Sequence, residues 1–170
     1  MEDILSVVDM KVRVKERMLK MMNKFISKSV KSLTNDFNRR IKNGKNGFQD
    51  FDEFLKWYNN QIKECYYCGL KEEESQILVT KILKSSRFPK NGISGRGTSR
   101  GMHLEVDRIN PNGKYSKENC VLCCYFCNND KSDVFHGDKY KEFSKDRVGF
   151  LRKLIKDFRI SLSKRRGGEE

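Results

Sequence analysis

Six cysteines carry the clearest chemical signal in this 170-residue sequence. Cys65 and Cys68 form one C-x-x-C pair, and Cys124 and Cys127 form another. Two such pairs are a common donor set for a tetrahedral structural zinc ion, because the two-residue gap lets both sulfurs reach one ion at about 2.3 Å. The spacing therefore predicts a structural Zn²⁺ site. Four sulfur ligands would leave no open position for a substrate, so any catalysis has to lie elsewhere.

Two alternatives to this assignment stay open from the spacing alone. Cys120 and Cys123 form a third C-x-x-C, so the register of the downstream zinc pair is ambiguous. One pair could instead be a redox dithiol, but the other pair would then have no role, and the thioredoxin-like strand and helix context is missing.

The charge balance points to a polyanionic partner. Lys and Arg outnumber Asp and Glu by 36 to 23, which gives a formal net charge of +13. Such an excess favours nucleic acid, although a solvated basic surface is the plainer alternative. No run of about eighteen apolar residues and no signal-peptide pattern is present. We therefore expect a cytoplasmic protein with no membrane partner, in which cysteines are metal ligands or free thiols rather than disulfides.

The elements expected around the cysteine pairs are mostly helical, with one pair of short strands. Amphipathic spacing predicts the helices, and alternation of polarity predicts the strand that ends near Arg108. Glycine-rich and lysine-rich stretches interrupt these elements. The expected helices lie within 3–42, 51–62, 72–86, 125–135 and 139–163, the strands at 102–108 and 120–123, and the breaks at 42–47 and 87–101.

The loop at 87–101 is rich in Gly, Ser and basic residues. It is either a flexible connector or a DNA-binding segment in which Arg96 and Arg100 contact phosphates.

The stretch HLEVDRINPNGKYSKENCVLCCYFCNNDKSD, residues 103–133, resembles the HNH endonuclease family, also called the ββα-metal or His-Me finger nucleases. In that family a strand ends in Asp-His, a loop with Gly leads to an Asn, and a second strand enters a helix that opens with C-x-x-C-N. The matching residues here are Asp107, Gly113, Asn119, Cys124, Cys127, Asn128 and Lys131. Because Asn128 follows Cys127 directly, the resemblance favours Cys124 and Cys127 as the second zinc pair.

Apolar spacing predicts a helical region at 1–62 and a helical extension at 136–170. The resemblance implies an α+β fold whose zinc-stapled ββα core lies between them at 63–135 and includes the basic loop. It also implies a divalent cation, Mg²⁺ or Mn²⁺, at the oxygens of Asp107 and Asn128, which suits the preference of these hard ions. By the same resemblance, Asn119 braces the loop and Lys131 contacts a phosphate of DNA.

Arg108 stands where the family has its general-base histidine. A guanidinium cannot accept a proton near neutral pH, so Arg108 could only bind phosphate or stabilise charge in the transition state. The remaining candidates for the base are His103, Glu105, Tyr115 with a lowered pKa, and water activated by the metal alone.

The function expected from these residues is metal-dependent hydrolysis of phosphodiester bonds in DNA, as in small nucleases of phages, mobile elements or restriction systems. A homodimer would allow cleavage of both strands. The alternative is a catalytically inactive nucleic-acid-binding protein held together by zinc. The presence of Arg108 at the position of the general base supports this alternative. A zinc-organised interaction module would explain the cysteines but not the charge.

Overall fold

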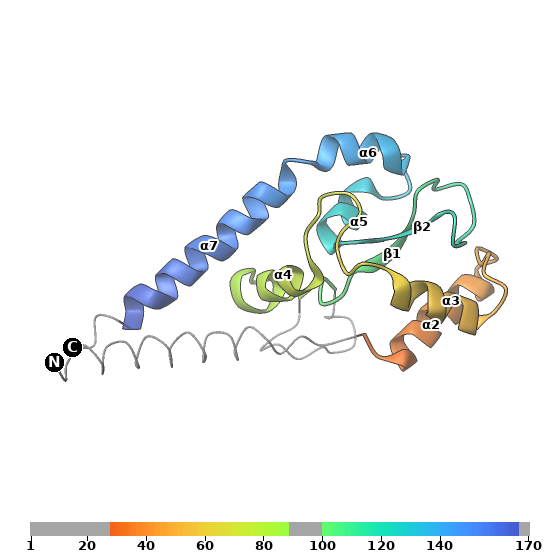
Figure 1. The fold of residues 1–170 in the computed structure, drawn as a ribbon, viewed down its shortest axis with the longest axis horizontal. Coiled ribbons are helices and arrows are strands. Elements are labelled where there is room, and N and C mark those ends of the chain that lie inside the picture. The colour runs from red at the N-terminus through yellow and green to blue at the C-terminus, as the bar shows by residue number, and fades with distance from the viewer. Residues whose placement is uncertain (1–27, 89–99, 167–170) are drawn as a thin grey trace.

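A computed structural model describes residues 28–88 and 100–166 of the chain. At its centre lie two short antiparallel strands and the helix that follows them, and further helices flank this unit on both sides (Figure 1). The fold is therefore α+β, as expected from the sequence. In the part of the chain described, no helix is both long and apolar enough to cross a lipid bilayer.

The N-terminal side of the described chain is a pair of helices, α2 (Val30–Lys42) and α3 (Phe51–Asn60). Each begins at a polar cap, because the Ser29 hydroxyl and the Asp50 carboxylate accept hydrogen bonds from backbone N–H groups of the first turn. The rings of Phe37 and Phe54 stack at 5.7 Å and join the two helices. The part of the expected first helix before residue 28 lies outside the described residues.

The central sheet consists of β1 (Glu105–Arg108) and β2 (Cys120–Cys123). Glu105 pairs with Cys123 and Asp107 pairs with Val121. The first strand starts later than the expected 102–108. The reason is that the preceding residues bond to a neighbouring helix: the Leu104 N–H donates to the Glu72 carboxylate at 2.8 Å instead of to a strand.

The segment 72–86, expected as one helix, is shorter and changes geometry. Helix α4 (Glu72–Ile77) continues into the π-helical turn η1 (Leu78–Ile82), which closes with a 2.7 Å hydrogen bond from the Leu83 N–H to the Leu78 carbonyl. Such wide turns usually occur as single turns attached to an α-helix.

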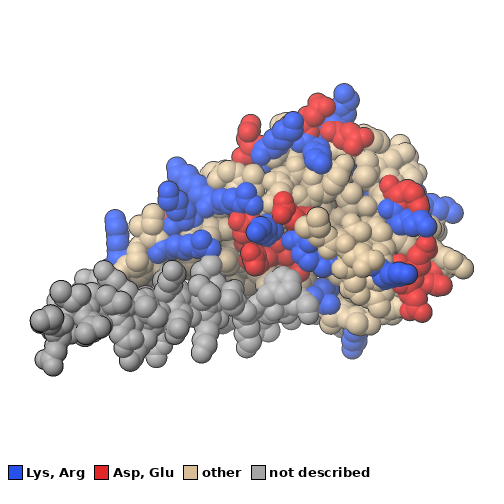
Figure 2. All heavy atoms as spheres, viewed as in Figure 1, with Lys and Arg blue, Asp and Glu red and all other residues tan. Residues whose placement is uncertain are grey.

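The C-terminal part contains α5 (Tyr125–Lys131), α6 (Gly137–Ser144) and α7 (Arg147–Arg166). Helix α7 packs against α4 and η1 through its first half and then extends away from the sheet (Figure 1). Its basic side chains gather along one edge of the molecule (Figure 2).

One cluster of buried side chains spans the whole described chain. It includes Leu33 from α2, Tyr58 from α3, Leu122 from β2 and Ile155 from α7. The helices on both sides are therefore packed onto the same core as the sheet, which holds their side chains in place around it.

Candidate functional site

The first candidate site is a group of four cysteine side chains. The sulfur atoms of Cys65, Cys68, Cys124 and Cys127 all lie within 4.8 Å of one another, and all four residues are buried. The Cys68 and Cys124 sulfurs are 3.8 Å apart. Four sulfurs at about 2.3 Å from one ion would be separated by about 3.8 Å, so the group fits a tetrahedral structural zinc ion.

The other two cysteines lie outside this group. Cys120 and Cys123 belong to β2, where Cys120 pairs with Arg108 and Cys123 with Glu105. Burial raises the pKa of Cys120 to about 12 and that of Cys123 well above its ordinary value, so both remain neutral thiols in the core. The structure thus separates the two registers that the spacing left open, and it brings Cys124 and Cys127 to the upstream pair.

The upstream cysteines are held by a tight turn. The Gly69 N–H donates to the Cys65 carbonyl at 2.8 Å, and Gly69 has φ +75°, a conformation that favours glycine. The Tyr66 N–H donates to the Leu122 carbonyl at 2.8 Å, which attaches the turn to β2. The cysteine group therefore joins the turn to the sheet and to the start of α5.

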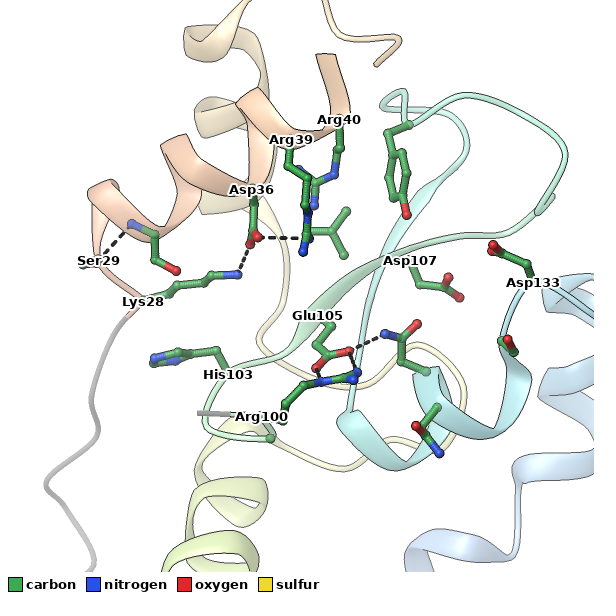
Figure 3. A pocket seen from close by; sticks show the side chains of 17 residues that line it. Lys28, Ser29, Asp36, Arg39, Arg40, Arg100, His103, Glu105, Asp107 and Asp133 are labelled. Carbon is green, nitrogen blue, oxygen red and sulfur yellow. Dashed lines mark hydrogen bonds and ion pairs between the residues drawn. The ribbon is translucent and has the colours of Figure 1, made fainter. Parts of the chain in front are cut away.

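The second candidate site is a cleft of about 760 Å³ between α2, β1 and α5 (Figure 3). Side chains alternate along a strand, so Glu105 and Asp107 of β1 share one face. Both line the cleft, together with Asn128 from α5. The charged side chains around it are Lys28, Asp36, Arg39, Arg40, Arg100, Glu105, Asp107 and Asp133.

Asp107 is held by two partners behind the cleft wall. Its Oδ2 accepts a 2.7 Å hydrogen bond from the Tyr67 hydroxyl and lies 3.1 Å from the Lys131 ammonium. Burial and the Asp107 charge raise the pKa of Tyr67, so this phenol stays protonated as the donor. Asp107 is 5 % exposed and Lys131 is fully buried. In this structure the Lys131 ammonium compensates the Asp107 charge, and its expected phosphate contact stays a prediction.

Tyr67 was missed in the sequence. Its one available signal is its position between Cys65 and Cys68, which places the ring beside the cysteine group. The same turn therefore serves both candidate sites.

Asn128 is oriented by Glu105 and Arg100. The Asn128 amide nitrogen donates to Glu105, which also accepts two hydrogen bonds from the Arg100 guanidinium at 2.8 and 2.7 Å. Arg100 in turn lies over the Tyr125 ring at 4.8 Å. Because a carboxylate can only accept, the amide nitrogen must face Glu105, and the carbonyl oxygen of Asn128 is left as an electron-pair donor.

Arg108 faces away from Asp107, as strand alternation requires. Its guanidinium is buried, donates to Asp133 at 2.8 Å and to the Gly113 carbonyl at 3.0 Å, and lies over the Tyr115 ring at 4.9 Å. In the described structure Arg108 does not line the cleft. Its contacts fasten the β1–β2 loop to the end of α5.

The other two expected base candidates, His103 and Tyr115, also line the cleft. The His103 ring points away from Glu105 and Asp107 (Figure 3), and its Nδ1 lies 3.6 Å from Glu72. Burial raises the pKa of Tyr115, although Arg108 and Arg40 act in the opposite direction, so the expectation of a lowered pKa is not met. Arg96 lies outside the described residues.

Comparison with known proteins gives a structural match. No family model matches the sequence, and no curated protein does. Among solved structures, the chain superposes on that of the rare-cutting HNH restriction endonuclease PacI with a TM-score of 0.52 and 23% sequence identity, over 71% of this chain and 81% of that chain. The fold is HNH-like.

In this HNH-like core, Asn119 ties the β1–β2 loop together. Its Oδ1 accepts from the Asn110 N–H at 2.8 Å, and its amide nitrogen donates to the carbonyls of Asn110 and Lys114 at 3.0 and 2.9 Å. A Cβ on Gly113 would lie 2.7 Å from the same nitrogen, so any larger residue there would displace the Asn119 amide.

Asn119→Ala should therefore lower the free energy of unfolding by about 1–3 kcal/mol, because three hydrogen bonds of a half-buried side chain are lost. Urea unfolding with an unchanged m-value measures this loss. Asn112→Ala is the matched control, since Asn112 lies exposed in the same loop, and it should change the free energy of unfolding by less than about 0.5 kcal/mol. Equal effects of the two changes would contradict the bracing role.

Proposed function

We propose that this protein is a metal-dependent DNA endonuclease that hydrolyses phosphodiester bonds. The observation that carries the proposal is that, in an HNH-like fold, Asp107 from β1 and Asn128 from α5 line one cleft. The similar solved structure is that of a restriction endonuclease that perturbs DNA. The net charge of +13 favours the same polyanionic substrate.

A hard divalent cation, Mg²⁺ or Mn²⁺, would be held by the carboxylate of Asp107 and the carbonyl oxygen of Asn128. The donor set fits such an ion. The Asn128 amide nitrogen donates to Glu105, which leaves the Asn128 oxygen available as a ligand. Tyr67 and Lys131 contact only Oδ2 of Asp107, which leaves Oδ1 available. When bound, the ion would acidify water and stabilise charge on the phosphate and the leaving oxygen.

The residues of this chain then act mainly by positioning. Tyr67 and Lys131 hold the Asp107 carboxylate, and Glu105 holds the Asn128 amide. Arg108 cannot take a proton, and Glu105 is already bound by Arg100. We therefore propose that bulk solvent accepts the proton of the attacking water. If a protein group accepts it instead, Glu105 is our first candidate.

Helices outside the HNH-like core would extend the contact with DNA. The basic side chains of α7 gather along one edge of the molecule (Figure 2). Four of them are exposed and could follow a phosphate backbone, namely Lys153, Lys156, Arg159 and Lys164, whereas Arg147 and Arg152 are paired with Asp130 and Glu74. Cleavage of both strands would need either two active sites, which a homodimer would supply, or two successive nicks by one site.

A plasmid-nicking assay with Mg²⁺ or Mn²⁺ tests the proposal. Asn128→Ala should slow nicking at least about 100-fold, the size of effect found when one preorganised transition-state group is lost. Asn112→Ala, the same change at an exposed loop position away from the cleft, should nick at the native rate. Nicking that persists in Asn128→Ala would contradict the proposed site.

The second candidate function is zinc-stapled binding of nucleic acid without hydrolysis. The contacts of Asp107 favour it, because Lys131 already compensates the carboxylate and Arg108 cannot serve as a base. This function predicts salt-sensitive DNA binding by the native protein, with no nicking in either metal.

A further inference from the structure

Arg40 of α2 is a cation that the HNH-like core does not account for. It lines the cleft, yet it makes no hydrogen bond or ion pair with any described residue. The other cations of the cleft wall are all neutralised within the described chain: Lys28 and Arg39 by Asp36 at 2.5 and 3.2 Å, and Arg100 by Glu105 at 2.7 Å.

Arg40 is also deeply buried. It is 5 % exposed, and its Nη1 has no partner among the described residues. The guanidinium carbon lies 4.9 Å from the centre of the Phe54 ring and 4.7 Å from that of the Tyr115 ring. These rings contact its faces, and the Nη1 donor in its plane is left without a partner among the described residues. Burial lowers the pKa of Arg40, and the charge of Asp36, which is paired with Lys28 and Arg39, offsets this only in part.

The position of Arg40 is fixed by the packing of α2. Leu33 and Phe37 of the same helix are buried in the core. The chain just after α2 is bonded to the β1–β2 loop, because the Gly47 N–H donates to the Tyr115 carbonyl and the Tyr115 N–H to the Lys45 carbonyl, each at 2.8 Å. Figure 3 shows Arg40 reaching from α2 toward the cleft that Asp107 lines from β1.

We propose that Arg40 binds a non-bridging oxygen of a backbone phosphate in the cleft, so that α2 completes the site from outside the HNH-like core. A guanidinium is suited to this, because its N–H donors match two phosphate oxygens in one plane. The ligand class, a phosphodiester of DNA, rests on the proposed function. The anion site itself rests only on the buried, unpaired Arg40.

DNA binding without cleavage gives the first test. In EDTA, the affinity for a short fluorescent duplex is measured by anisotropy over a series of salt concentrations. Arg40→Met, which keeps an unbranched apolar side chain, should weaken binding at least about 10-fold and lower the salt slope by about 1. Lys42→Met is the matched control on the same helix, since Lys42 is exposed and outside the cleft, and it should leave the slope unchanged. Equal losses in both would indicate a general charge effect and overturn the inference.

Inorganic phosphate separates ligand binding from a purely structural role. A ligand of the folded state raises Tm, so phosphate should raise the Tm of the native protein and of Lys42→Met above that in chloride at equal ionic strength. Phosphate also stabilises folded proteins in general by exclusion from their surface, so Arg40→Met should show only this general rise in Tm, smaller than that of Lys42→Met, and equal rises in the two variants would overturn the inference. If Arg40→Met does not fold, Arg40→Lys replaces it and should show a smaller rise than the native protein. A native protein whose Tm does not respond to phosphate would overturn the inference.

The two proposals fail in different ways. If the native protein binds DNA through Arg40 but does not nick plasmid, the endonuclease proposal fails and the anion site stands. If the native protein nicks and Arg40→Met has the same kcat, KM and phosphate response, the anion site fails and the endonuclease proposal stands.

Discussion

Cys65→Ser should remove zinc from the protein and unfold the HNH-like core. Cys65 is buried with Cys68, Cys124 and Cys127 in one sulfur group, and a hydroxyl cannot replace a thiolate ligand. Structural zinc contributes about 10 kcal/mol or more in small zinc-stapled folds, which is comparable to the whole net stability of a domain. Metal analysis should find one zinc per native chain and none in the variant, and circular dichroism should show loss of the cooperative unfolding transition.

Cys120→Ser is the matched control for this prediction. Cys120 is equally buried but belongs to β2 and lies outside the sulfur group. The variant should keep one zinc per chain and lose only about 1–3 kcal/mol, the cost of burying a poorly satisfied hydroxyl. Zinc retained by Cys65→Ser, or lost from Cys120→Ser, would contradict the assignment of ligands.

A change in the sulfur group should also alter the position of the Asp107 carboxylate in the cleft. Tyr67 lies between Cys65 and Cys68, and its hydroxyl donates to Asp107. A change in the turn that carries both cysteines therefore moves a partner of the Asp107 carboxylate. This contact is a direct physical link between the structural site and the proposed catalytic site.

Lys131→Met should destabilise the protein by about 3–5 kcal/mol, because it leaves the buried Asp107 carboxylate without its counter-ion. Combining it with Asp107→Asn should restore much of the loss, since the double variant removes both charges of this buried pair. Urea unfolding of the native protein, the two single variants and the double variant measures the coupling between the two residues.

An exposed ion pair provides the comparison. Lys117 lies 3.6 Å from Glu53, and its side chain is 61% exposed, so Lys117→Met should cost less than about 0.5 kcal/mol. Similar losses for Lys131→Met and Lys117→Met would show that the buried pair is not coupled as the structure indicates.

Because Asp107→Ala alone would combine lost catalysis with lost stability, Asn128→Ala is the cleaner probe of the cleft.

Local sequence patterns were sufficient for the elements closest to the chemistry. The C-x-x-C spacing predicted the sulfur group, and Asn128 directly after Cys127 favoured the register that the structure adopts. These features were readable because they depend on bond geometry over a few residues, which the order of side chains determines.

The pairing of charges was decided only by the tertiary structure. Whether Lys131 meets solvent or Asp107, whether Tyr67 reaches a carboxylate, and whether Arg40 enters the cleft all depend on which distant segments pack together. A lysine or arginine has a long side chain that suits a surface as well as an ion pair, so its residue type does not distinguish the two. The sequence by itself therefore determined the two C-x-x-C pairs and the strand–strand–helix order. The tertiary structure decided which downstream cysteines join the sulfur group, and the packing of α2 and α5 against β1 decided which charges meet in the cleft.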